Sequence, residues 1–303
     1  MNVTRHKRRR TVRLAAIVTM LLGILPLAGT VSAAHTDRGP VEVAFSVTTT
    51  ETLDEGESWT VGDNFYLRGS MTAESVEGDI TGTAIITMDG QFIAAEGCND
   101  EACPGNTDVW ADFDVTTESG SWDGFMAFQF DDVAATEVGK VFLIGRGDNA
   151  GKAFAGDLAF SEEIESSVNV TGQMITMAKP SQGVKVFYDG CFVPPAGTAG
   201  AMLMTVGGHD DSGAWSATYP LLIPGAMSFG ESTITTELGT VDSFLMIESN
   251  GATRNGYFML TGGTGAYEHL YGFGIVRTSA YESAHCADGA GAGGYWIGQA
   301  YAN

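Results

Sequence analysis

The chain has 303 residues, and its 37 Asp and Glu against 15 Lys and Arg give a formal net charge of −22 at pH 7. A surface this acidic repels nucleic acid and anionic lipid, so neither is expected as a partner. The length suits one large domain or two small ones.

The first 34 residues match a cleavable export signal. A basic run at residues 5–13 precedes an apolar core at 14–31, and small residues suited to cleavage follow. A retained membrane anchor is the alternative, but Pro26 and Gly29 interrupt the apolar core. We therefore expect a secreted or cell-envelope protein with no membrane contact after cleavage, exported by the general or the twin-arginine route. Cleavage leaves 9 basic residues against 37 acidic ones, a charge near −28.

Four cysteines in an exported chain favour disulfide bonds over a metal site or thiol chemistry. They allow three pairings, of which the most local joins Cys98 to Cys103 and leaves Cys191 to Cys286. A zinc site does not fit, because the C-x4-C spacing has no second Cys or His pair at a usual distance. The acidic clusters lack the spacing of a calcium-binding loop. No metal and no other cofactor is expected.

Alternation of apolar and polar residues predicts an all-β protein. In residues 109–115, Val, Ala, Phe and Val face one side while Trp, Asp and Asp face the other. Turn signals such as the Asn-Gly pairs at 250–251 and 255–256 separate strands of this kind. Helical periodicity is scarce.

The chain is predicted to be a tandem duplication. Residues 141–160 resemble residues 257–276 at an offset of 116, with paired glycines nine residues apart in both. Weaker matches follow at offsets of 118, 119 and 121; they join 82–90 to 200–208, 125–128 to 244–247 and 66–69 to 187–190.

Each unit is long enough to close an eight-stranded antiparallel barrel, which removes free sheet edges. We therefore expect two tandem barrels, at residues 41–160 and 167–303. The joint is placed at residues 161–166, where charge rises and the strand pattern lapses. One larger sheet shared by both units is the alternative architecture.

A glycine loop near the C-terminal end is predicted to be structural. Gly262, Gly263, Gly265 and Gly272 lie between two apolar strands, where positive φ or close backbone approach favours glycine. A phosphate cradle would need a helix after the loop, and here a strand follows.

Several of these motifs together resemble the allene oxide cyclase barrel, which is related in shape to dirigent proteins. They are residues 61–69 (Val-Gly-Asp-Asn-Phe-Tyr-Leu-Arg-Gly), then Gly82 before a hairpin, and residues 258–267 (Phe-Met-Leu-Thr-Gly-Gly-Thr-Gly-Ala-Tyr). The first unit has Gly-Arg-Gly-Asp at 145–148 in place of the Thr-Gly-Gly signature.

The resemblance implies an eight-stranded antiparallel barrel in which an acid on an early strand closes a fatty-acid epoxide, helped by asparagines and a cysteine. By position, Glu51 takes the place of the acid and Asn64 that of one asparagine. The cysteine position holds Ala84, and the early strand of the second unit, residues 168–174, has no carboxylate.

Three classes of function remain open from the sequence. The first is a secreted barrel that binds a small apolar ligand, the second a cyclase or isomerase acting on such a molecule, and the third a non-catalytic extracellular structural protein. No nucleophile and base pair can be placed. A set of apolar residues lines a ligand pocket or fills a barrel core, and both readings stay open: Phe125, Met126, Phe128, Phe130 and Phe142. The first class leads, because it accounts for the fold resemblance without requiring catalytic residues.

Overall fold

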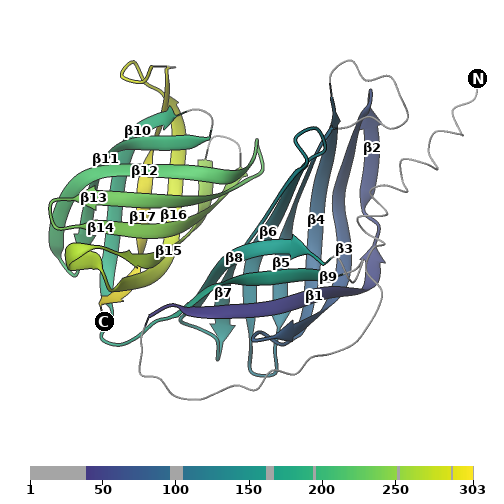
Figure 1. Ribbon diagram of the computed structural model, residues 1–303, viewed down its shortest axis with the longest axis horizontal. Helices are drawn as coiled ribbons and strands as arrows, with labels where there is room; N and C mark the ends of the chain where they lie inside the picture. Colours follow the sequence, from purple (N-terminus) through teal and green to yellow (C-terminus); the bar gives the residue numbers. More distant parts are fainter. Residues whose placement is uncertain are drawn as a thin grey trace, which may run out of the picture.

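The computed structural model describes residues 39–95, 105–161, 167–193, 196–250, 253–287 and 289–302. These residues form an all-β structure of two closed eight-stranded antiparallel barrels in tandem, as predicted (Figure 1). The export signal falls at residues 1–34 and lies outside the described residues. Within the described parts of the chain, no helix has the length and apolar character needed to cross a membrane.

The first barrel is a meander of eight strands that closes when β1 pairs with both β3 and β9. A ninth strand, β2 (Glu57–Val61), pairs only with β3 and extends it as a hairpin. The barrel strands are β1 (Val41–Asp54), β3 (Asn64–Gly78), β4 (Gly82–Ala94), β5 (Gly105–Thr116), β6 (Gly120–Asp131), β7 (Thr136–Gly147), β8 (Lys152–Phe160) and β9 (Ser167–Thr176).

The second barrel closes through the pairing of its first and last strands, β10 and β17. One short 3-10 turn, η1 (Gly265–Tyr267), interrupts the meander between β15 and β16. The strands are β10 (Gln182–Val193), β11 (Gly197–Val206), β12 (His209–Ile223), β13 (Met227–Thr236), β14 (Thr240–Asn250), β15 (Thr253–Gly263), β16 (Leu270–Glu282) and β17 (Ala290–Ala302).

The boundary between the barrels differs from the predicted one. Strand β9, which we expected to open the second barrel at residue 167, completes the first by pairing with β8 and β1. Without β9, strand β1 would keep one unpaired edge, which a closed barrel avoids. The joint therefore lies between Thr176 and Gln182. Of the predicted joint, residues 162–166 lie outside the described residues.

The predicted repeats agree with the strand order only in part. Counted from the first strand of each closed barrel, β6, β7 and β8 correspond to β14, β15 and β16. The sequence matches at offsets 116 and 119 join these same strands. The matches at offsets 118 and 121 join β4 to β11 and β3 to β10, one strand out of step.

Alternation along each strand builds an apolar core inside each barrel. Aromatic side chains occupy much of both interiors, including Phe113 and Trp122 in the first and Phe258 and Trp296 in the second. Met126, Phe128 and Phe130 point into the first core, as a barrel-lining role requires. These side chains therefore line the interiors of both barrels, with alternate residues of each strand facing inward.

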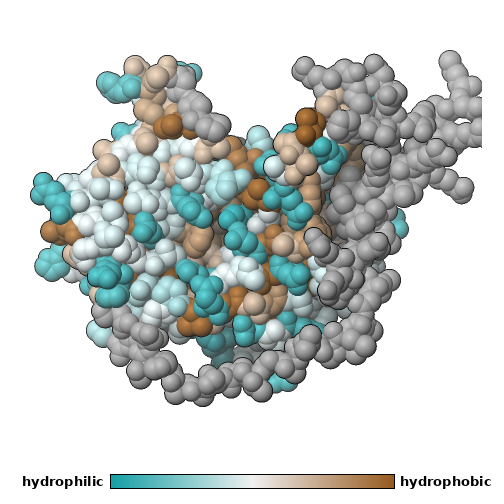
Figure 2. All heavy atoms as spheres, viewed as in Figure 1, coloured by the Kyte–Doolittle hydropathy of each residue, from teal (hydrophilic) through white to brown (hydrophobic). Residues whose placement is uncertain are grey.

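The two barrels contact each other through the outer faces of their strands. This interface buries a third apolar cluster, to which β5–β9 and β12–β17 contribute, and it includes Phe142, Met246 and Met259. Phe125 and Phe142, which the sequence left as pocket or core residues, both face this interface, where the Phe142 ring stacks on Tyr257 at 5.9 Å. No described strand pairs across the interface, so the barrels do not share one sheet. Figure 2 shows mostly white and teal residues on the visible face of the second barrel, at the left.

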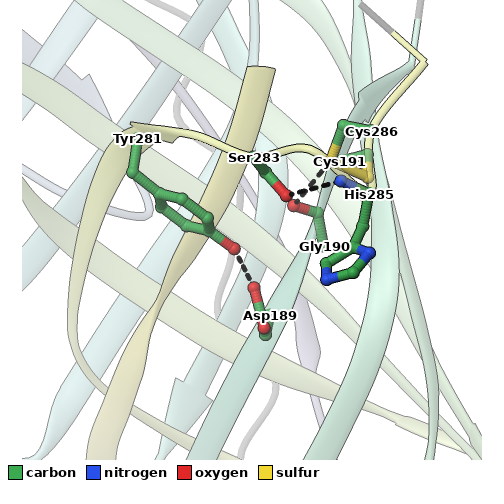
Figure 3. The surroundings of a disulfide bond; sticks show 7 residues. All are labelled: Asp189, Gly190, Cys191, Tyr281, Ser283, His285 and Cys286. Atoms are coloured by element: carbon green, nitrogen blue, oxygen red, sulfur yellow. Dashed lines mark hydrogen bonds between the residues drawn. A yellow bond between two sulfur atoms is a disulfide. The ribbon is translucent and has the colours of Figure 1, made fainter. Parts of the chain in front are cut away.

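The disulfide between Cys191 and Cys286 is present, as one of the predicted pairings requires. It joins the end of β10 to the loop between β16 and β17 (Figure 3). Beside it, the Tyr281 hydroxyl donates a hydrogen bond to Asp189. The disulfide therefore fastens the loop between β16 and β17 to the barrel wall at β10. Cys98 and Cys103 lie outside the described residues.

Candidate functional site

The two residues placed by family resemblance lie far apart in the first barrel. Glu51 is exposed on β1 and lies opposite Ala73 of β3. Asn64 begins β3, and its side-chain oxygen accepts a hydrogen bond from the Ala94 amide at 3.1 Å. Nine residues of strand separate Ala73 from Asn64 on β3, a distance of roughly 30 Å at about 3.3 Å per residue. The structure therefore does not bring Glu51 and Asn64 into one site.

A β-bulge explains the outward direction of Glu51. The preceding residues Val47 and Thr49 are buried inside the barrel, and simple alternation would point Glu51 inward as well. The pairing of β1 with β3 shifts between Thr49 and Glu51, however, and such a bulge moves the following side chains to the other face.

The glycine loop has a structural role, as predicted from its composition. The Ala266 amide donates to the Leu238 carbonyl at 2.9 Å, which ties the loop to the turn between β13 and β14. Gly265 has φ +60°, and an added Cβ would lie 2.3 Å from the Leu238 oxygen. Only glycine fits this approach. Beside the loop, the Tyr267 hydroxyl donates to Asp211 at 2.8 Å, and burial followed by this bond raises the pKa of Tyr267 to about 12.

Among the described residues, Glu74 on β3 is the buried carboxyl group that faces the interior of the first barrel, and it is 3 % exposed. The Thr49 hydroxyl on β1 donates to Glu74 Oε1 at 2.6 Å. Glu74 Oε2 has no hydrogen-bond partner, and neither has the Thr72 hydroxyl two residues earlier on the same inward face. We call Thr49, Thr72 and Glu74 the Glu74 cluster. Ala84, which stands in the cysteine position of the resemblance, lies directly opposite Glu74 on β4.

Burial raises the pKa of Glu74, and the nearby hydroxyls of Thr49 and Thr72 partly oppose this rise. The Thr72 hydroxyl thus lowers the pKa of the carboxyl group as a nearby hydrogen-bond donor does, although its position does not meet the geometry of a hydrogen bond. No described Lys or Arg forms an ion pair with Glu74. The cluster combines a carboxyl group and a hydroxyl that each have an unused hydrogen-bonding atom.

The second barrel interior holds a cluster of three aromatic rings with polar edges, which we call the indole cluster. The Tyr188 ring lies 4.5 Å from Trp215, and the two Trp rings meet edge to face at 6.5 Å. Both indoles are buried, Trp215 at 3 % and Trp296 at 0 % exposure. Neither indole N–H has a hydrogen-bond partner. The barrel therefore buries two unpaired donors in one aromatic cluster.

A polar row crosses the barrel wall beside the indole cluster. Tyr188 pairs with Gly294, Gly294 with Thr278, and Thr278 with Arg254, so these residues share one hydrogen-bonded row of four strands. The Arg254 guanidinium lies 5.7 Å from the ring centre of Phe192. Burial raises the pKa of Tyr188, so its hydroxyl stays a donor at neutral pH. Hydrogen-bond donors and a cation thus predominate in this row.

A groove of about 540 Å³ lies next to the second barrel, between the barrels. Its lining joins the ends of β10, β11 and β12 to Lys140 of the first barrel. It includes Thr198 and Tyr219, whose hydroxyl oxygens lie 3.4 Å apart. Burial raises the pKa of Tyr219, with Arg254 near enough to oppose this rise. The groove therefore reaches the side chains that adjoin the polar row.

The sequence contains signals for both clusters, which our prediction did not use. Thr72, Glu74 and Val76 alternate with outward residues along β3, so Glu74 shares the face of an apolar neighbour. Trp215 similarly shares the inward face of Ala217 on β12. A polar group on the apolar face of an alternating strand marks a buried polar site.

Within the described residues, no group of three or more His, Cys, Asp or Glu side chains is arranged to hold a metal ion. No family model, no curated protein and no solved structure matches the chain at a significant level of similarity.

Proposed function

We propose that this protein is an exported double β-barrel that binds a small apolar ligand in its second barrel, through a hydrogen-bond acceptor on that ligand. The observation that carries the proposal is the pair of buried, unpartnered indole N–H groups of Trp215 and Trp296. An unsatisfied buried donor costs about 1–3 kcal/mol, so an acceptor placed between two of them regains a large stabilisation. The surrounding aromatic rings suit an apolar body on the same ligand.

The groove between the barrels is the proposed entry route of this ligand to the indole cluster. Its volume of about 540 Å³ is within the range of small-molecule sites. Tyr219 lines this groove and lies close to Arg254 of the polar row. Because the row offers donors and a positive charge, the ligand end that meets it should bear an oxygen acceptor.

The test compares variants that keep the aromatic ring and lose the N–H group. Protein purified from its own host should carry a bound small molecule in native mass spectrometry, and Trp215→Phe or Trp296→Phe should lower the bound fraction. Trp59→Phe is the matched control, since Trp59 is 45 % exposed on β2, outside both barrels. If no ligand co-purifies and all three variants melt like the wild type, the interior is a packed core, and the structural alternative replaces the proposal.

The cyclase or isomerase alternative now depends on a different carboxyl group. Glu51 is exposed, whereas Glu74 lies inside the first barrel with an unpartnered oxygen. A buried carboxyl with a raised pKa is the kind of group that proton transfer needs. No base or second acid adjoins Glu74 within its cluster, so ligand binding remains the leading proposal.

A further inference from the structure

The first barrel contains a polar patch that the ligand of the second barrel leaves unexplained. Four buried polar residues lie on the facing strands β1 and β3, among the apolar side chains of the core: Thr49, Ser70, Thr72 and Glu74. The second barrel has no buried carboxyl group among its described residues. The patch is therefore specific to the first barrel.

Two atoms of this patch converge without partners. Glu74 Oε1 is satisfied by Thr49 at 2.6 Å, but Glu74 Oε2 and Thr72 Oγ1 make no hydrogen bond. The two side chains are 3 % and 1 % exposed, so bulk water does not satisfy them. Thr72 and Glu74 are neighbours on one face of a strand, and the Thr72 hydroxyl is near enough to lower the pKa of the carboxyl group as a hydrogen-bond donor does. A ligand group placed between them would satisfy both atoms.

Charge decides which ligand group fits best. A buried carboxylate needs a cation or several donors, and no described Lys or Arg pairs with Glu74. Residues 39–177 contain 26 acidic and 4 basic residues, so the field of the first barrel attracts cations and repels anions. An ammonium group has three donors, enough for both unpartnered atoms.

We propose that the first barrel binds a small primary amine in its cationic form, with the ammonium group donating to Glu74 Oε2 and to Thr72 Oγ1. The rest of the amine is apolar, because Val47, Val76 and Ile86 surround this patch in the core. This site is independent of the second-barrel ligand. It lies in the other barrel, and it binds a cationic hydrogen-bond donor, whereas the second barrel binds a hydrogen-bond acceptor.

The test titrates the full chain with n-hexylammonium chloride by calorimetry at pH 7, with n-hexanol and hexanoate as matched probes. We expect saturable one-to-one binding of the ammonium, at least tenfold weaker binding of hexanol, and none of hexanoate. Glu74→Gln should weaken ammonium binding at least tenfold. Glu77→Gln is the control, because Glu77 is exposed on the same strand.

Three outcomes overturn the proposal: no saturable binding of the ammonium, equal binding of hexanol, or unchanged binding by Glu74→Gln. Thr72→Val serves as a second variant if Glu74→Gln does not fold, and it should weaken binding in the same direction. A separate readout is the carboxyl carbon resonance of Glu74, whose pKa the bound ammonium should lower. These measurements leave the second barrel untouched, so they succeed or fail independently of its ligand.

Discussion

Thr49 donates a 2.6 Å hydrogen bond to Glu74 between two neighbouring strands of the first barrel, and both side chains are buried. The bond holds one oxygen of the carboxyl group in place and leaves the other unpartnered. A structural carboxyl group would normally be satisfied at both oxygens. The arrangement therefore positions Glu74 for a further partner and makes it sensitive to pH.

Glu74 should make the protein less stable as pH rises. Burial raises its folded-state pKa above the unfolded value, so the folded state binds more protons between the two values. The contribution of protonated Glu74 to the free energy of unfolding is complete below the unfolded pKa, and it is lost as pH rises through the folded pKa. Glu74→Gln should therefore be more stable than the wild type at pH 7, and the difference should shrink as pH falls through the folded pKa and be lost below the ordinary value of 4.5. Urea unfolding of both proteins from pH 4 to 8 measures this, and a constant difference across the range would contradict it.

The Cys191–Cys286 disulfide should stabilise the second barrel strongly. The two residues are 95 apart in sequence, and closing so long a loop restricts the unfolded chain. Replacing either cysteine with alanine should cost about 2–5 kcal/mol in the free energy of unfolding. Urea titration at fixed pH gives this value. The double variant should lose no more than the single ones, and a much larger loss would show that the cysteines act separately.

The position of the joint predicts which fragments fold. A first fragment that ends after Ala178 keeps β9 and all eight barrel strands, whereas one that ends at Ser161 lacks β9. The longer fragment should melt cooperatively, and the shorter one should not, because β1 and β8 then have free edges. Circular dichroism melting of both fragments checks this. Equal cooperativity would mean that β9 is dispensable for the first barrel.

Local alternation was enough to predict the fold class, and the length of each repeated unit was enough to predict an eight-stranded barrel. The pattern in residues 109–115 appears in β5 as Val109, Phe113 and Val115 buried against Asp112 and Asp114 exposed. Alternation with a period of two indicates which face of a strand is buried, and it can be recognised without knowledge of the tertiary structure. The disulfide between Cys191 and Cys286 was among the predicted pairings, since four cysteines behind a predicted export signal allow only three pairings.

The site residues were harder to predict, because they depend on register. Alternation from Thr49 points Glu51 inward, and only the bulge seen in the pairing with β3 turns it outward. Which barrel β9 joins likewise depends on pairing with β1, more than 110 residues earlier in the chain. No local pattern encodes such a long-range pairing. Glu74, by contrast, was accessible from the sequence, because it alternates with Val76 on an unbroken part of β3.

The interface between the barrels gives the last prediction. Phe142 is 1 % exposed, although it faces away from the core of its own barrel, and its ring stacks on Tyr257 of the second barrel. Phe142→Ala should therefore cost about 3–5 kcal/mol, as for a core phenylalanine. Trp59→Ala is the control, because Trp59 also stacks on an aromatic ring, that of Tyr66, but lies on the exposed β2–β3 hairpin. This substitution should lower the free energy of unfolding by less than about 1 kcal/mol.

Urea unfolding measures both variants. In calorimetry we expect one transition for the wild type and two for Phe142→Ala, in which each barrel unfolds separately. The split follows because the interface contains no strand pairing, so side-chain packing is the main coupling between the barrels. If Phe142→Ala destabilises no more than Trp59→Ala, the barrels do not pack in solution through this face. The groove beside Tyr219, which needs Lys140 of the first barrel as one wall, would then lose its shape as well.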